Sequence, residues 1–274
     1  MNDIILPRLK IISLIDKYYA LQLGCYFTEV FTKENTKFAF CSMIDSPIWN
    51  HVYLEKIDNE EVDNIERKEI TEFRNRNREI CIYIPEEQDH NKLTGRGYKE
   101  VDNEVWMVLN ESIIFNEERQ LTYTKVVGID DLKLFSEIVA ECFEPEYGVA
   151  IKSEYQQGHP EKSIRHFIGW WEGKAVSACS IYYDEVTCNI HNVSVLPEFR
   201  KKGFGNDTIR FIRNYAKSLN CDYVILQSDG GDWREDFYYK NGFLRFFRRL
   251  GYEKVENYEK KDSIRCCSEF NRGE

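Results

Sequence analysis

The first 115 residues carry helical and extended patterns of apolar side chains in turn. Apolar residues recur at intervals of three and four between residues 11 and 23, which predicts a helix. The segments KFAFCSMI, NHVYLEKI and EICIYIP alternate or run apolar, as strands do. A charged helical stretch lies between the second and third of these, and the extended segment EVWMVLNESIIF ends the region.

The second half shows a longer series of elements. LTYTKVV predicts a strand, and GIDDLKLFSEIVAECF predicts a helix in which Asp130 is placed to cap the first turn. Residues 165–196 then predict three strands, with turns at Glu172-Gly173 and Asp184-Glu185.

An amphipathic helix follows these strands. Ile209, Ile212, Ala216 and Leu219 fall on one helical face, and Asn220 stands where such a helix would stop. DYVILQS is the next predicted strand. Antiparallel strands followed by strand, helix and strand indicate an α+β fold with a central mixed sheet.

The chain length of 274 residues favours two domains over one. The polar stretch 116–120 is the predicted linker, although it has neither proline nor glycine. We therefore expect one domain at residues 1–118 and a second at residues 119–274.

The composition limits the partners. The formal net charge of −10 argues against nucleic acid and against an anionic membrane surface. No apolar run approaches the ~20 residues of a membrane helix, and the N-terminal segment lacks the basic start and cleavage site of a signal peptide. These features predict a cytoplasmic protein.

The nine cysteines form no CxxC pair and no regular framework, which is typical of reduced and mostly buried thiols. The adjacent Cys266 and Cys267 lack further ligands at zinc-like spacing, and the five histidines form no HExxH. We expect no metal.

The segment RKKGFG places two glycines between an apolar strand and an amphipathic helix. Backbone N–H groups at such a helix start, with the helix dipole behind them, form a cradle for anions such as phosphate. The loop is not a Walker loop, and Thr208 replaces the third glycine of the dinucleotide pattern GxGxxG. The alternative is an ordinary turn with solvated lysines.

The longer stretch NVSVLPEFRKKGFG, with the order Val-x-Pro-x-x-Arg-x-x-Gly-x-Gly, closely resembles the acyl-CoA-binding motif of the GNAT N-acetyltransferase superfamily. The order of elements extends the resemblance over residues 121–258. It implies a mixed sheet flanked by helices, and the transfer of an acetyl group from acetyl-CoA to a primary amine.

The resemblance also implies roles for single residues. The strand end formed by Val193, Ser194 and Val195 would splay from its neighbour and offer backbone groups to the pantetheine arm. The pyrophosphate would be held by the N–H groups of six consecutive residues: Arg200, Lys201, Lys202, Gly203, Phe204 and Gly205. The Arg200 side chain either contacts phosphate or supports the loop.

A base would accept the proton from the attacking amine. The two-residue period of a strand places Asn189, His191, Val193 and Val195 on one face, so His191 is a candidate base. A structural histidine is the alternative. Related enzymes often use a strand carboxylate here, and Asn189 occupies one such position.

An acid would protonate the departing thiolate. The family commonly places a tyrosine four residues before the glycine of the helix-to-strand turn, and in FFRRLGYEKV that position is Phe247. The upstream DFYYKNGF offers Tyr239 and Tyr238 before a second Gly-Phe, with Tyr239 preferred. Packing is the alternative role for both tyrosines.

The first half has no Arg-x-x-Gly-x-Gly, and its sequence is weakly similar to the back half, in chain order, of the GNAT fold. We expect a degenerate tandem copy, or alternatively a cap, that walls the acceptor site. The expected partners are acetyl-CoA and a small-molecule or peptide amine, with the chain a monomer or homodimer. The alternative function is a catalytically weak CoA-binding sensor.

Overall fold

The structure is a computed structural model that describes residues 4–24, 26–33, 36–44, 46, 49–76, 81–110, 120–143 and 163–254. The chain forms two compact units. The larger unit comprises Met1–Val30, Cys41–Ile44 and Glu104–Arg248, and the smaller comprises Phe31–Phe40, Asp45–Asn103 and Arg249–Glu274. These units are discontinuous in sequence, and the division into domains at residue 118 stays a prediction.

The smaller unit joins a set of short strands to short helices. Its strands follow the order β1-β2-β3-β4-β11. The elements that lie in it wholly or in part are β1 (Glu29–Lys33), β2 (Thr36–Phe40), β3 (His51–Leu54), α2 (Asn59–Asn64), the π-helical turn η1 (Ile65–Glu69), α3 (Ile70–Asn75), β4 (Cys81–Pro85), α4 (Asn91–Thr94), β5 (Tyr98–Leu109) and β11 (Phe243–Lys254). The strands and charged helix predicted from the first half are present.

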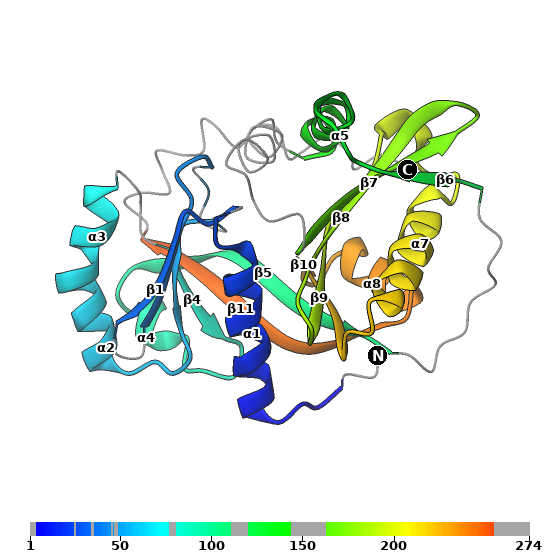
Figure 1. Ribbon diagram of the computed structural model, residues 1–274. Coiled ribbons are helices and arrows are strands. Elements are labelled where there is room, and N and C mark those ends of the chain that lie inside the picture. Colours follow the sequence, from blue (N-terminus) through cyan, green and yellow to red (C-terminus); the bar gives the residue numbers. More distant parts are fainter. Residues whose placement is uncertain are drawn as a thin grey trace. The chain divides into compact units, whose positions relative to one another are not determined.

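The larger unit contains the long strands of the second half, and Figure 1 shows β7, β8 and β9 running side by side. Its strand order is β5-β10-β9-β8-β7-β6, with parts of β5 and β11 in each unit. Its other elements are α1 (Arg8–Gln22), β6 (Thr122–Lys125), α5 (Ile129–Cys142), β7 (Ile164–Trp171), β8 (Lys174–Tyr183), β9 (Thr187–Val195), the 3₁₀ turn η2 (Pro197–Phe199), α7 (Phe204–Ser218), β10 (Tyr223–Asp229) and α8 (Trp233–Lys240).

The pairing confirms the predicted fold class. Strands β6 to β9 pair antiparallel in sequence order, whereas β10 pairs parallel with β9 and antiparallel with β5. Antiparallel neighbours can be joined by tight turns, and the parallel pair needs the crossover that α7 supplies. The fold is mixed α+β, with a mixed sheet flanked by helices.

Helix α7 packs its apolar stripe against the sheet of the larger unit. Ile209, Ile212 and Ala216 are buried in one cluster with strand residues such as Ile190 and Leu226. Asn220, in the left-handed region with φ of 57°, follows the end of α7 as predicted.

Two local predictions are wrong. Asp130 does not cap α5, because the N-cap is Gly128 and the neighbouring Asp131 accepts a hydrogen bond from the Val127 N–H at 3.2 Å. The segment FFRRLGYEK is not a helix-to-strand turn, because all of it lies within β11. Its apolar residues are spaced as well for a strand as for a helix end, and strand pairing with β4 decides the outcome.

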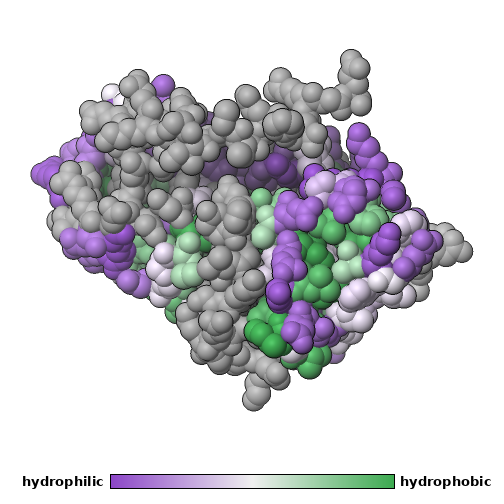
Figure 2. Space-filling view, turned by 90° about the horizontal axis from the view of Figure 1, so that it is seen from above, coloured by the Kyte–Doolittle hydropathy of each residue, from purple (hydrophilic) through white to green (hydrophobic). Residues whose placement is uncertain are grey.

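The described surface combines polar and apolar areas, and Figure 2 shows hydrophilic side chains (purple) beside apolar ones (green) on one face. Among the described residues, no helix is long and apolar enough to cross a membrane. Six described cysteines are free, and five of them are buried as predicted; the described exception is Cys142.

Candidate functional site

The site begins where two parallel strands diverge. The pairing of β9 with β10 ends at Ile190 and Leu226, although β9 continues to Val195 and β10 to Asp229. Beyond Ile190, the backbone of β9 therefore forms no ladder with β10. This end of the pairing is compatible with the splay predicted for Val193 to Val195, which stays a prediction.

A β-bulge in β9 accompanies the divergence. Ser180 pairs with His191 and Ala178 with Ser194, so one residue of β8 opposes two residues of β9. Asn192, one of those two, has φ of 55°. An extra residue of this kind bends and twists the strand locally, which turns the end of β9 away from β10.

The bulge also changes which side chains share a face. Val193 packs against the same cluster as Ile190, whereas His191 contacts residues of α1 on the opposite face. The prediction that His191, Val193 and Val195 share one face is therefore wrong. A strict two-residue period holds only in a strand without an inserted residue.

Hydrogen bonds from three other segments hold the bulge. The Tyr26 hydroxyl donates to Asn192 Oδ1 at 2.9 Å, and Asn192 Nδ2 donates to Ser180 Oγ at 2.9 Å. His166 Nδ1 lies 2.7 Å from the same Ser180 oxygen. Tyr26, Ser180 and His166 are all buried.

The loop after β9 has the backbone expected of an anion cradle. Lys201 and Gly203 both have positive φ, 62° and 87°. The Arg200 Nε–H donates to the Val195 carbonyl at 3.1 Å, so the arginine ties the loop to the strand end. This contact favours the loop-supporting role of Arg200 over a phosphate contact.

Helix α7 starts directly from this loop, with Gly203 as its N-cap. The Asp207 N–H donates to the Gly203 carbonyl at 3.1 Å, and the preceding N–H groups, from Phe204 to Asn206, are those that an α-helix leaves without an acceptor of its own. The Phe204 side chain is buried. The first turn of α7 thus offers backbone N–H donors, while the buried Phe204 side chain anchors the helix.

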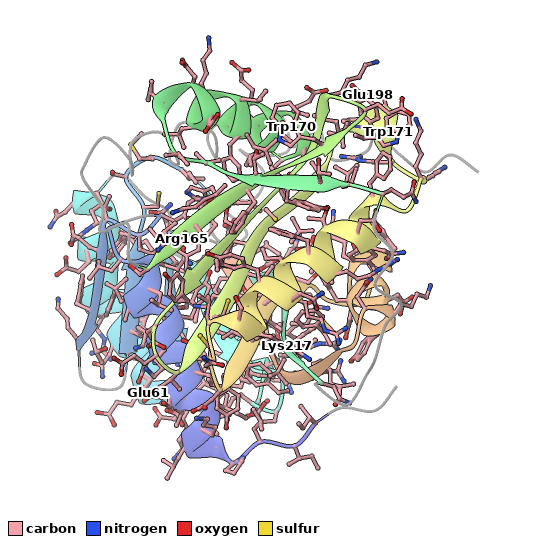
Figure 3. The ribbon with its side chains drawn as sticks, turned by 45° about the vertical axis from the view of Figure 1, so that its right-hand side comes forward. Glu61, Arg165, Trp170, Trp171, Glu198 and Lys217 are labelled. Atoms are coloured by element: carbon pink, nitrogen blue, oxygen red, sulfur yellow. The ribbon has the colours of Figure 1, made fainter. Side chains whose placement is uncertain are left out.

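Lys201 and Lys202 of the loop are both exposed. The Lys202 ammonium lies 5.0 Å from the ring centroid of Trp171 and 5.2 Å from that of Phe199, which places its charge over an aromatic pair. In Figure 3, Trp171 and Glu198 lie near one end of α7 and Lys217 near the other.

Gly205 serves helix packing. A Cβ at this position would lie 3.4 Å from the Phe237 ring of α8. Asn241 Nδ2, just after α8, donates to Asn206 Oδ1 at 3.0 Å. A side chain at residue 205 would therefore point toward α8.

His191 is enclosed by neutral groups. Its Nε2 lies 2.9 Å from Gln22 Nε2, and its ring stacks on Tyr18 at 5.6 Å and packs edge-on against Tyr182 at 5.1 Å. Burial lowers the pKa of His191 to about 3. The ring is neutral at physiological pH, and these contacts favour the structural alternative over the base.

The helix-to-strand turn lies at YYKNGF. Helix α8 ends at Lys240, Gly242 has φ of 85°, and β11 starts at Phe243. Tyr238 occupies the position four residues before this glycine. Burial raises the pKa of its phenol, with Asp229 adding to the rise.

The other two aromatic candidates lie on α8 and β11. Tyr239, on α8, packs beside the core of the larger unit, as Tyr238 does. Phe247 lies in the middle of β11, with its ring 6.3 Å from Trp106, so it does not occupy the predicted turn position.

Two polar residues of the larger unit were not predicted as site residues. Glu104 is buried on β5, and its Oε1 accepts hydrogen bonds from Trp106 Nε1 and, at 3.0 Å, from Gln227 Nε2. Gln227 lies on β10 just beyond its pairing with β9. A carboxylate opening the apolar run EVWMVL is the sequence signal for Glu104.

Asn189 is 1% exposed, and its Oδ1 and Nδ2 have no hydrogen-bond partner among the described residues. In the described ranges no group of three or more His, Cys, Asp or Glu side chains could hold a metal ion. Cys266 and Cys267 lie outside these ranges.

Comparisons with known proteins concern the family and the fold. Residues 132–243 match the family model of the acetyltransferase (GNAT) family. A search of curated proteins found no match.

Solved structures share the fold at low identity. A GCN5-related N-acetyltransferase from Kribbella flavida aligns with a TM-score of 0.65 at 13% identity, covering 87% of this chain and 95% of that one. A conserved protein of unknown function from Staphylococcus epidermidis ATCC 12228 gives 0.63 at 16%, covering 82% and 93%. A tandem GNAT protein from the clavulanic acid biosynthesis pathway gives 0.52 at 10%, covering 79% and 77%. Residues 132–243 are therefore similar to the acetyltransferase (GNAT) family, and the chain shares its fold with solved GNAT acetyltransferases.

Proposed function

We propose that this chain transfers the acetyl group of acetyl-CoA to a primary amine. The observation that carries the proposal is the divergence of β9 from β10 directly before the cradle loop. The diverging strand offers free backbone groups to an extended arm, and the helix start offers N–H donors to a diphosphate. Both features lie within the stretch 190–206, so one elongated ligand can use them together.

The residues present fit such a ligand. Gly203 has no Cβ, and a Cβ built there would find only Gln120 Nε2 within 4 Å, at 3.6 Å. The loop is therefore open above Gly203, and its positive φ suits glycine. The Phe204–Asn206 N–H groups and the helix dipole favour an anion at this point.

Acetyl-CoA supplies a thioester, whose carbonyl carbon the neutral amine attacks as the C–S bond breaks. The chain holds the two reactants together, which alone can lower the barrier substantially. Tyr238 stands four residues before the turn glycine, and its phenol is the proposed donor of a proton to the departing sulfur. Burial raises the pKa of this phenol, which keeps it protonated but makes it a weaker acid. Tyr239 is the second candidate for this role.

His191 does not accept the proton of the amine in this arrangement, because its ring is held against Gln22 and Tyr18. We propose that this proton leaves through water. This is the observation that keeps the catalytically weak CoA sensor as a second candidate. Neither candidate requires a metal.

The first half of the chain would not bind a second coenzyme. Its sequence has no Arg-x-x-Gly-x-Gly, and we propose that it is a degenerate copy of the same fold. One CoA per chain is the expected stoichiometry.

Calorimetric titration with acetyl-CoA, followed by mass spectrometry of mixtures with an amine panel of polyamines, aminoglycosides and peptides, tests the proposal. We expect one binding site per chain and an acetylated product for at least one amine. Binding without any acetylated product across the panel would favour the sensor. No binding of acetyl-CoA would overturn both functions.

A further inference from the structure

An aromatic group lies beside the cradle and has no role in the function proposed above. It consists of Trp171, Phe199 and Phe204, with the Lys202 ammonium over it. The Trp171 ring centroid lies 6.0 Å from that of Phe199 and 5.6 Å from that of Phe204. Only Phe204 is fully buried, whereas Trp171 and Phe199 are partly exposed.

Three separate segments meet here. Trp171 ends β7 and precedes the Glu172-Gly173 turn, Phe199 ends η2, and Lys202 belongs to the cradle loop. The Phe204 ring anchors the group from the first residue of α7. The partly exposed indole of Trp171 therefore lies beside the start of α7, whose N–H groups would hold a diphosphate.

The position of Lys202 is chemically informative. An ammonium over an aromatic face gains a modest attraction at an exposed site, and its flexible four-carbon stem leaves it free to move to a stronger anionic partner. A phosphate that arrives at the loop is such a partner. Once the lysine has moved, the indole face that it covered is available for a flat ring.

We propose that Trp171 and Lys202 form the subsite for the adenosine 3′-phosphate end of the coenzyme. The indole stacks on the adenine base, and the ammonium pairs with a phosphate of the nucleotide. Aromatic side chains stack on bases irrespective of sequence, and lysine is a common phosphate partner. The inference rests on the proposed function, since it concerns the same coenzyme.

The subsite would make the protein selective for acetyl-CoA over acyl carriers that contain only a phosphopantetheine arm. Those carriers can bind to the diverging strand and to the start of α7, but they have no adenine ring that could stack on the indole. The nucleotide is thus the part of the ligand whose binding depends on Trp171.

Two comparisons test the subsite: CoA against pantetheine 4′-phosphate for Trp171, and CoA against 3′-dephospho-CoA in wild type and Lys202→Met for the ammonium. Titrations of CoA and of pantetheine 4′-phosphate are made with the wild type, Trp171→Leu, Trp171→Phe and Trp170→Leu. Trp170 is the matched control, because it is the neighbouring tryptophan, is partly buried, and donates its indole N–H to Thr124 Oγ1 at 2.8 Å. Figure 3 labels both tryptophans.

We expect Trp171→Leu to weaken CoA about tenfold while changing pantetheine 4′-phosphate less than twofold. Trp171→Phe should retain most of the CoA affinity, and Trp170→Leu should retain all of it. Lys202→Met should reduce the preference for CoA over 3′-dephospho-CoA.

Several results would overturn the subsite. Equal CoA affinity in wild type and Trp171→Leu would show that the indole is not part of the subsite. An equal loss of affinity for CoA and for pantetheine 4′-phosphate in Trp171→Leu would show the same. An unchanged preference for CoA over 3′-dephospho-CoA in Lys202→Met would remove the ammonium. In all of these cases the wild type still binds CoA, so the proposed function stands; a wild type that does not bind CoA overturns both.

Discussion

The Tyr26 hydroxyl donates a hydrogen bond to Asn192 Oδ1 at 2.9 Å, across 166 residues of sequence. Asn192 is the left-handed residue of the bulge at which β9 leaves β10. A residue near the start of the chain thus stabilises the backbone that opens the proposed coenzyme site. The N-terminal segment is part of the folded unit that carries this site.

Tyr26→Phe tests this contact. The change removes only the hydroxyl and leaves Asn192 Oδ1 without its donor, so we expect a loss of about 1 kcal/mol in the free energy of unfolding. CoA affinity should fall a few-fold because the bulge is less firmly held. Urea unfolding and calorimetric titration measure the two effects. Tyr215→Phe is the control and should change CoA affinity little. Tyr215 is a partly buried tyrosine of α7 whose ring packs edge-on against Phe167 and tilted against Phe211. Equal CoA affinity in Tyr26→Phe and wild type would contradict the role of the contact.

A fragment of residues 119–274 should be poorly folded. It lacks α1, Tyr26 and the part of β5 that pairs with β10, all of which belong to the larger unit. The ring of His191 would lose Tyr18 and Gln22, and apolar surface would be exposed. We expect low solubility and no cooperative thermal transition by circular dichroism. A soluble fragment that binds CoA as tightly as the whole chain would show that residues 1–118 are dispensable.

The two loop glycines should differ on substitution. Gly203→Ala introduces a Cβ at φ of 87°, which costs about 1 kcal/mol, and it adds volume over the proposed diphosphate position. We expect CoA affinity to fall at least tenfold. Gly97→Ala places the same strain at φ of 84° in the smaller unit and is the matched control, with CoA affinity expected to be unchanged.

Gly205→Val should act on stability instead. Its branched side chain would press on the Phe237 ring, and overpacking of this kind costs roughly 1–3 kcal/mol. Gly205→Ala meets the ring only at an ordinary contact distance of 3.4 Å and should be tolerated. If Gly205→Ala abolished CoA binding while folding normally, a Cβ at residue 205 would lie in the space of the anion and not against α8.

Tyr238→Phe should lower turnover by about 10²-fold with little change in CoA affinity, a typical contribution of a general acid. Tyr239→Phe is the matched control on the same helix, and Phe247→Tyr should have no effect because Phe247 lies within β11. Steady-state kinetics with any acetylated amine measures all three. Full activity in Tyr238→Phe would remove it as the acid, and a loss confined to Tyr239→Phe would assign the role to that residue.

Local chemistry made much of the fold predictable. The turns at Glu172-Gly173 and Asp184-Glu185 and the glycine loop before α7 each depend on a few adjacent residues, and all are present. The bulge at Asn192 was not predictable in this way, because it depends on hydrogen bonds from Tyr26 and Ser180, which are distant in sequence.

In the candidate site too, features set by adjacent residues were predictable, and features set by residues distant in sequence were not. The cradle follows from consecutive residues, Arg200 to Gly205. The environment of His191 does not, because Gln22 and Tyr18 come from a helix 169 and 173 residues away in the sequence. The two candidate helix-to-strand turns were YYKNGF and FFRRLGY. The structure distinguishes them because β11 begins at Phe243 and contains all of the second segment.

His166, which is buried, and His191, which is enclosed by neighbouring rings, predict acid sensitivity. Burial lowers the pKa of His191 and of His166 to about 3 in the folded chain, below the ordinary value of 6.5. Between about pH 6.5 and 3 the unfolded state therefore binds more protons than the folded state, so the free energy of unfolding falls as the pH is lowered through this range. The slope is at most about 1.4 kcal/mol per pH unit for each histidine. Urea unfolding at intervals from pH 7.5 to 5 measures it, and His191→Gln, which keeps a polar side chain beside Gln22, should reduce the slope by up to that amount. An unchanged slope in His191→Gln would mean that His191 takes up a proton as readily in the folded chain as in the unfolded one, and would restore it as a candidate base.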